Sequence, residues 1–147
     1  MTTIPSAESD AWNLSEGSRQ GRPSFVRYRP NLASFVGDPR YPRHLTFTWN
    51  YAESQECELP TEAQSDEMRV FEDSLVATFD PERTAILAFV FTEAGVRVWH
   101  YYVGDLDDLG DRINTALSYS SSRLPVEIAI EDDAEWQEFR LVLSQCK

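Results

Sequence analysis

The stretch that decides the fold is TAILAFVFTEAGVRVWHYYV, residues 84–103. Residues 84–91 are apolar almost throughout and rich in β-branched and aromatic side chains, which predicts a central strand covered on both faces. Glu93-Ala94-Gly95 predicts a tight turn, and residues 96–103 predict a second strand that pairs back on the first. We therefore expect an antiparallel hairpin in the middle of a sheet.

Two further strands are indicated by alternation between large apolar and polar side chains, at residues 43–51 and 124–131. A period of two places the large groups on one face of the sheet, and the rest on an outer face. The inward set is Leu45, Phe47, Trp49, Tyr51, Val126, Ile128 and Ile130. The outer face is expected to show His44, Thr46, Thr48, Asn50, Glu127, Ala129 and Glu131, together with Arg97, Trp99 and Tyr101 of the hairpin.

Apolar residues at three- and four-residue spacing predict three helices. The first begins at Pro60-Thr61-Glu62 and ends at Asp80-Pro81, the second covers residues 105–119, and a short third follows Asp132 or Asp133. Their apolar faces are Met68, Phe71, Leu75, Val76 and Phe79; Leu106, Leu109, Ile113, Ala116 and Leu117; and Trp136, Phe139 and Leu143.

The order of these elements predicts an α+β fold. Residues 11–16 and 23–29 predict an N-terminal hairpin, and the proline-rich residues 30–42 predict a loop. The rest follows the order βαββαβ, which is typical of the ferredoxin-like (split βαβ) arrangement, with an antiparallel sheet and two helices on one face. We expect one domain over residues 11–147, with a short C-terminal helix and a flexible N-terminus at residues 1–10.

Charge is distributed unevenly along the chain. The net charge is -12, yet residues 1–50 carry +2, so residues 51–147 carry -14. A field of this sign repels nucleic acid and anionic membranes, and it favours encounter with a basic protein. An acidic surface that only serves solubility is the alternative.

The sequence contains no motif of a common catalytic or cofactor site. It lacks glycine-rich phosphate loops and the GxSxG pattern, and its one lysine is Lys147. Cys57 and Cys146 lack the CxxC spacing of a zinc site, and no signal peptide or membrane span is visible. We expect a cytoplasmic protein with reduced thiols, no cofactor and no metal.

Acidic residues are the first candidates for a binding site. The candidate partner-binding residues are Asp105, Asp107, Asp108, Glu131, Asp132 and Asp133, with Trp99 and Tyr101 as aromatic anchors. Aromatic residues often dominate protein interfaces, although the N-terminal hairpin could instead cover them as core. A cation site at residues 131–135 is disfavoured, because the spacing and glycine of a calcium loop are absent.

A small-ligand site is the alternative location of function. Convergent polar and aromatic groups at predicted strand positions suggest His44, Arg97 and Tyr101. His44 and His100 could ligate a metal if the fold joined them with a carboxylate, but neither has a partner at ligand spacing. Ordinary strand histidines are the favoured interpretation.

Three short patterns resemble a known family. They are TEAGVRVWHYY at residues 92–102, EDDAEW at residues 131–136, and RHLTFTWNY at residues 43–51 leading into Leu59-Pro60. Together they are similar to the bacterial family catalogued as domain of unknown function 695, over residues 11–140. Ala134 stands where such proteins often have proline, which concerns a helix cap and not the fold.

The resemblance implies a small cytoplasmic α+β domain without an established activity. Members are sometimes joined to a domain like the ribonuclease E regulator B, and small acidic proteins of this kind occur among toxin-immunity proteins. Both associations suggest a protein that binds and restrains another protein. The leading hypothesis is therefore a non-enzymatic immunity or inhibitor protein, monomeric or weakly dimeric, that occludes a basic toxin or nuclease. A self-associating structural domain and a small-ligand binder or enzyme are the alternatives.

Overall fold

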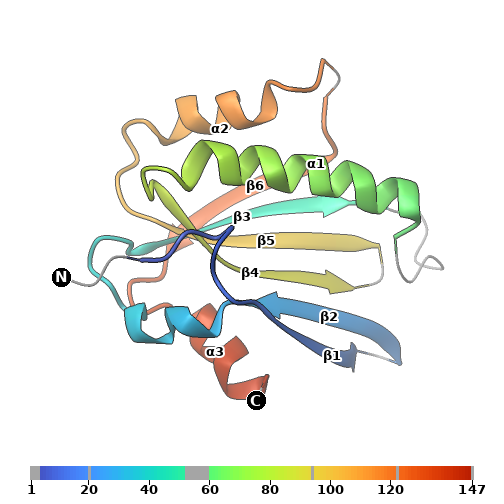
Figure 1. Ribbon diagram of the computed structural model, residues 1–147, viewed down its shortest axis with the longest axis horizontal. Coiled ribbons are helices and arrows are strands. Elements are labelled where there is room, and N and C mark those ends of the chain that lie inside the picture. The colour runs from blue at the N-terminus through green and yellow to red at the C-terminus, as the bar shows by residue number, and fades with distance from the viewer. Residues whose placement is uncertain (1–3, 20, 52–59, 94, 122, 147) are drawn as a thin grey trace.

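The computed structural model describes residues 4–19, 21–51, 60–93, 95–121 and 123–146. Its centre is one sheet with the strand order β1-β2-β4-β5-β3-β6, in which every neighbouring pair is antiparallel (Figure 1). The strands are β1 (Asn13–Arg19), β2 (Arg22–Tyr28), β3 (Arg43–Asn50), β4 (Ala85–Glu93), β5 (Val96–Val103) and β6 (Val126–Asp132). Strands β1 and β6 form the two edges of the sheet.

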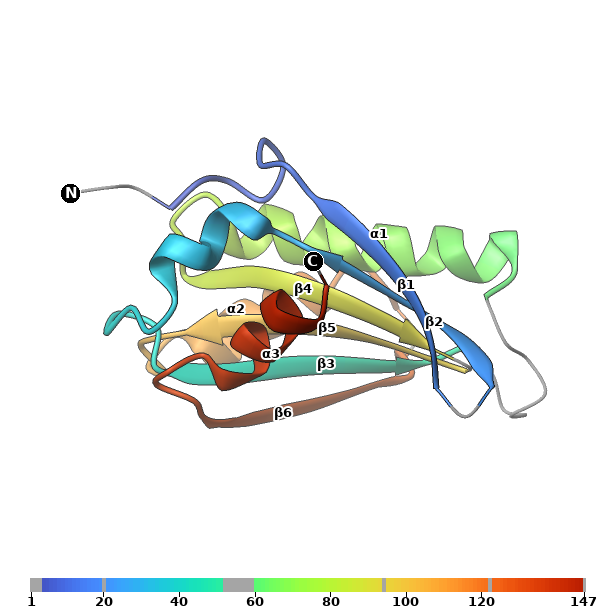
Figure 2. The same cartoon turned by 90° about the horizontal axis from the view of Figure 1, so that it is seen from below.

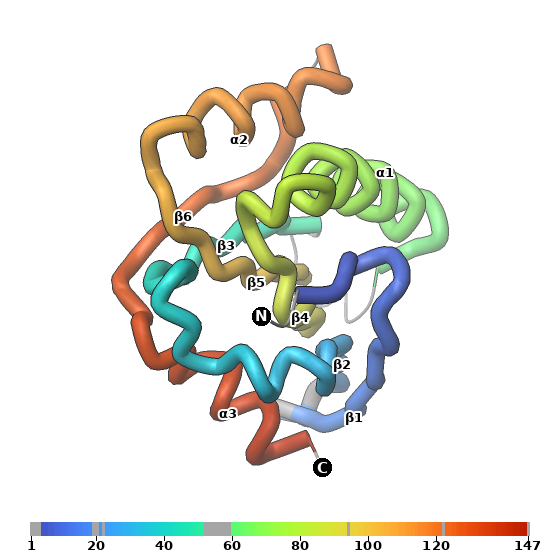
Figure 3. Tube along the Cα trace, turned by 60° about the vertical axis from the view of Figure 1, so that its left-hand side comes forward, coloured from blue at the N-terminus to red at the C-terminus, as the bar shows by residue number. Residues whose placement is uncertain are grey.

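Helical segments cover both faces of the sheet. Helices α1 (Glu62–Phe79) and α2 (Leu109–Leu117) lie on one face, which we call the helix face. The 3₁₀ helix η1 (Pro30–Phe35) and helix α3 (Gln137–Gln145) lie on the opposite face (Figures 2 and 3). The sheet is thus the middle layer of three.

Helix α1 is fixed at its start by a capping box. The Thr61 side chain accepts a hydrogen bond from the Gln64 backbone N–H, and the Gln64 side chain accepts one from the Thr61 backbone N–H. Gln64 also donates to the Tyr51 carbonyl at 2.6 Å, which ties the helix start to the end of β3. The helix buries Met68, Phe71, Leu75 and Phe79 against the sheet.

The opposite face has its own hydrophobic core. The Tyr102 and Trp136 rings stack with centroids 4.2 Å apart, and Phe139 of α3 packs edge-on against Trp136. Strand β4 contributes to both cores, because Leu87 faces α1 whereas Ile86 faces α3. This burial on two faces confirms the central strand that the apolar run predicts.

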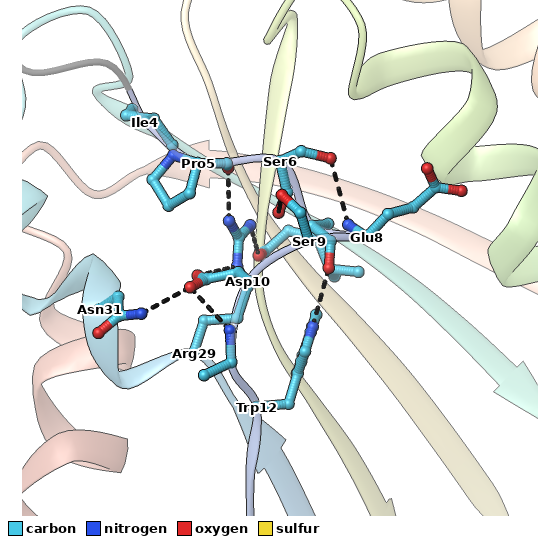
Figure 4. Close-up of polar contacts among 12 residues, drawn as sticks. Ile4, Pro5, Ser6, Glu8, Ser9, Asp10, Trp12, Arg29 and Asn31 are labelled. Atoms are coloured by element: carbon cyan, nitrogen blue, oxygen red, sulfur yellow. Dashed lines mark hydrogen bonds and ion pairs between the residues drawn. The ribbon is translucent and has the colours of Figure 1, made fainter.

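The segment before β1 packs against the domain. Ile4 is buried in the second core, and Asp80 accepts hydrogen bonds from the Ser6 hydroxyl and the Ala7 backbone N–H. Asp10 forms an ion pair with Arg29 at the end of β2 (Figure 4). Residues 4–10, which the sequence analysis expects to be flexible, therefore have defined contacts in this structure.

The α+β class, the antiparallel sheet and the two helices on one face are confirmed, with several differences of detail. The sheet has six strands, more than the split βαβ arrangement contains, because hairpin β1–β2 extends it beyond β4. Helix α2 begins at Leu109 rather than at residue 105, and the expected loop 30–42 includes η1. Within the described ranges, no helix combines the length and the apolar character that crossing a membrane requires.

Candidate functional site

The two proposed aromatic anchors are core residues, which corrects the sequence analysis. Trp99 lies opposite Phe47 and Tyr101 opposite Leu45 in the β3–β5 register, and cross-strand partners point to the same face. Both side chains therefore pack beneath α1, where Trp99 is 0% and Tyr101 1% exposed. Neither can contact a partner protein.

The two acidic segments come together at one end of the sheet. Asp105, Asp107 and Asp108 lie in the connection after β5, and all three are exposed. Arg43 of β3 is paired with Val103 at the end of β5 on one side and with Asp132 at the end of β6 on the other. The ends of β5 and β6 are thus separated by one strand, about 10 Å.

The acidic residues at this end differ in how they are engaged. Asp132 is 95% exposed and lies 3.8 Å from Arg43, and Glu131 is 71% exposed. Among the described residues, Asp105, Asp107 and Asp108 take part in no ion pair. Their charges are therefore available to a partner.

Asp133 has a structural role instead. Its carboxylate accepts hydrogen bonds from the Tyr102 hydroxyl at 2.8 Å and from the Gln137 backbone N–H at 2.8 Å. A third bond comes from the Glu138 backbone N–H at 3.3 Å, so Asp133 caps α3. Asp133 therefore serves the fold and is not a candidate contact residue.

Strand β6 adds an apolar component that the sequence analysis did not expect to be exposed. Ile128 and Ile130 point to the helix face, opposite Phe47 and Leu45, as expected. They are nevertheless 44% and 43% exposed, because α2 packs against α1 and does not cover the edge strand. The signal for this exposure was the position of the strand at a sheet edge, which only the topology reveals.

Together these residues make up a candidate surface at one end and along one edge of the sheet. We call it the β6 edge surface. It consists of Asp105, Asp107, Asp108, Ile128, Ile130, Glu131 and Asp132. Exposed apolar groups next to unpaired charges are typical of a protein-binding surface.

The alternative ligand site is not assembled. His44 is opposite Tyr102 in the register and lies on the α3 face, whereas Tyr101 is in the core beneath α1. Arg97 lies near the other end of β5, where its Nε donates to Thr92 Oγ1 at 2.8 Å. The three residues therefore do not share a pocket.

The fold does bring the two histidines together. His44 Nε2 and His100 Nδ1 are 2.8 Å apart, and Glu131 Oε1 is 3.5 Å from His44 Nδ1. Burial, with a smaller contribution from His44, lowers the pKa of His100 to about 3, so that this ring is neutral at neutral pH. The His44–His100 bond thus joins a donor on one ring to an acceptor on the other. Over the described ranges, no group of three or more His, Cys, Asp or Glu side chains is arranged to hold a metal ion.

Of the two cysteines, only Cys146 lies in the part of the chain that the structure describes. Cys146 is a half-buried free thiol after α3, and its carbonyl accepts a hydrogen bond from the Tyr28 hydroxyl. Cys57 lies outside the described residues.

Comparison with known families gives one match. The model of the family of unknown function DUF695 matches residues 10–144, nearly the whole chain, so the chain belongs to this family. This confirms the family resemblance that the sequence patterns indicate. No curated protein and no solved structure matches the chain.

Proposed function

We propose that this member of the DUF695 family is a non-enzymatic protein-binding module that recognises a basic protein through the β6 edge surface. In its most concrete form it is an immunity or inhibitor protein, which neutralises a cationic toxin or nuclease by covering its functional surface. Such occlusion requires a complementary surface and no catalytic group. Nucleic acid and anionic membranes are disfavoured as partners, because their phosphates are repelled by a net charge of -12.

The observation that carries this proposal is that unpaired acidic residues and exposed isoleucines lie at the same end and edge of the sheet. Asp105, Asp107 and Asp108 supply a negative field that steers a basic partner, and Ile128 and Ile130 supply apolar area for it to bury. The outer edge of β6 also presents backbone groups that β3 does not pair. An extended basic segment of the partner could add to the sheet there.

Self-association through β6 is less favourable than a basic partner. Two β6 strands paired antiparallel about Ala129 would place Glu127 opposite Glu131 twice. Like charges directly opposite each other destabilise a strand pair. We therefore expect a monomer in the absence of the partner, although Ile128 would face Ile130 in such a dimer.

We also infer that the four strands β4-β5-β3-β6 are a split βαβ core. Helix α1 connects β3 to β4, and β5 lies between these two strands in the sheet. Helix α2 connects β5 to β6, and β3 lies between those two strands. This order supports the ferredoxin-like interpretation, with the hairpin β1–β2 as an addition. It places the last strand, β6, at an open edge.

A charge-reversal experiment tests the proposal. The tagged chain is used to capture proteins from its native lysate at low salt, in parallel with Asp105→Lys/Asp107→Lys/Asp108→Lys and with a control, Asp66→Lys/Glu67→Lys/Asp73→Lys, on exposed positions of α1. We expect the wild type and the control variant to retain a basic protein, which is released as the salt concentration rises. The variant with lysine at positions 105, 107 and 108 should not retain it. Equal retention by all three chains would contradict the proposed surface.

A further inference from the structure

A second candidate site lies on the other side of the molecule from β6. A partly open pocket of about 320 Å³ lies on the helix face, beside hairpin β1–β2 and Pro60, which lies just before α1. Its walls are mainly apolar and include Leu14, Phe25, Pro60 and Val90. Its polar groups are Arg27, Thr92 and Arg97. The volume is at the lower end of the range for small-molecule sites.

One of the two arginines is already neutralised. Arg27 Nη2 bonds to Glu72 Oε1, and the same oxygen accepts a hydrogen bond from Trp99 Nε1 at 2.8 Å. Arg27 also lies over the Trp12 ring, 5.2 Å from its centroid. These contacts fix Arg27 at the wall of the pocket, and the charge of Glu72 balances that of Arg27.

Arg97 is the cation that remains available. Its Nε donates to Thr92 Oγ1, which orients the guanidinium and leaves its two terminal nitrogens for other partners. In the part of the chain that the structure describes, Arg97 is in no ion pair. Burial and the neighbouring Arg27 lower the pKa of Arg97, but an arginine stays protonated in proteins.

We propose that this pocket binds a small organic monocarboxylate. The carboxylate accepts hydrogen bonds from the terminal guanidinium nitrogens of Arg97, and the apolar body of the ligand packs against Phe25 and Val90. The planar guanidinium matches a carboxylate with two parallel hydrogen bonds. With two arginines and Glu72, the pocket carries a net charge of +1, which suits a monoanion. Inorganic phosphate would meet a single uncompensated cation and apolar walls, and it is expected to bind more weakly.

This site is independent of the proposed partner surface. The pocket involves β1, β2, β4 and β5, whereas the β6 edge surface is at the opposite edge of the sheet (Figure 1). Ligand binding and capture of a basic protein can therefore be measured separately, and the failure of one leaves the other intact.

Titration of the full-length chain with benzoate, benzamide and inorganic phosphate tests the proposal. Benzamide keeps the ring and removes the charge, and phosphate keeps the charge and removes the ring. Nuclear magnetic resonance can follow the Arg97 Nε–H and the backbone amides of Val90 and Thr92. We expect benzoate to shift these signals in a saturable manner and to bind at least about tenfold more tightly than benzamide or phosphate.

Variants assign the effect to the guanidinium. Arg97→Gln is expected to bind benzoate and benzamide alike, Arg97→Lys to retain an intermediate preference, and Arg69→Gln, an exposed arginine of α1, to behave as wild type. Equal affinity of the wild type for benzoate and benzamide would overturn the proposal. So would benzoate shifts confined to residues outside the pocket, or no shift at all. These comparisons on the wild type decide the question even if Arg97→Gln fails to fold.

Discussion

Arg29 Nε lies 2.9 Å from Asp10 Oδ2, and their side chains are 1% and 2% exposed, so the chain holds a buried ion pair between β2 and the segment before β1. Arg29 also donates to the carbonyls of Leu87 at 2.8 Å and Pro5 at 2.6 Å. Figure 4 shows the guanidinium between Asp10 and the Pro5 carbonyl. One side chain thus joins the N-terminal segment to the central strand β4.

Removal of Asp10 should destabilise the domain strongly. Asp10→Ala leaves a buried guanidinium without its counter-ion, and breaking one partner of such a pair typically costs about 3–5 kcal/mol. The control is Asp66→Ala, since Asp66 and its partner Arg69 are 54% and 69% exposed, and about 0–1 kcal/mol is expected for it. Urea unfolding curves give both free energies. Equal losses in the two variants would mean that the Asp10–Arg29 pair does not hold the N-terminal segment.

Local patterns predicted most of the elements, because they depend on periodicity along the chain. The strand at residues 96–103 has the expected bounds, and the strand at residues 43–51 ends one residue earlier than expected. The apolar spacing predicts a start of α2 that is too early, because Leu106 continues the spacing although it is exposed in the structure. The role of Arg29 was not foreseen, since its partner is 19 residues away.

The candidate site was harder to predict, since it depends on how strands pair. The acidic candidates are exposed in the structure apart from Asp133, which caps α3, and their contact with a partner stays a prediction. Trp99 and Tyr101 were placed on the wrong face because β5 carries apolar residues on both of its faces, so that alternation alone cannot orient it. The contact between His44 and His100 joins residues that are 56 positions apart. No local pattern carries that information.

Truncation of Trp99 separates its core role from the anchor role. Trp99→Ala removes a fully buried ring that contacts Trp49 and Phe71, and it is expected to cost about 3–5 kcal/mol. Ile128→Ala, at a half-exposed position of β6, should cost about 1 kcal/mol or less. Thermal or urea unfolding measures both. A small loss for Trp99→Ala would contradict its place in the core.

The low pKa of His100 predicts a pH-dependent stability. His100 is neutral in the folded protein down to pH about 3, whereas an unfolded histidine has a pKa of about 6.5. Between these two pH values the unfolded chain therefore binds more protons than the folded protein. The contribution of the neutral His100 to stability is fully present above pH 6.5 and is lost as the pH falls. The expected slope is up to about 1.4 kcal/mol per pH unit for this one group.

Comparison with His100→Gln isolates that contribution, since carboxylates also titrate at the acidic end of the range. Between pH 6.5 and 5, the free energy of unfolding should fall more steeply in the wild type than in the variant. Nuclear magnetic resonance of the imidazole signals should also show no titration of His100 near pH 6.5. A normal titration there would refute the buried neutral ring.

Asp133 and Asp132 form a natural pair for testing the capping of α3. Asp133→Ala removes the acceptor of two backbone N–H groups and of the Tyr102 hydroxyl, and losses of about 1–3 kcal/mol are expected from the cap and the orphaned hydroxyl. Asp132→Ala, at a 95% exposed position, should change stability by no more than about 0.5 kcal/mol. If Asp132 belongs to the β6 edge surface, its loss should instead weaken capture of the basic partner. If Asp132→Ala lowers the free energy of unfolding as much as Asp133→Ala does, both carboxylates serve the fold. Asp132 would then not belong to the β6 edge surface.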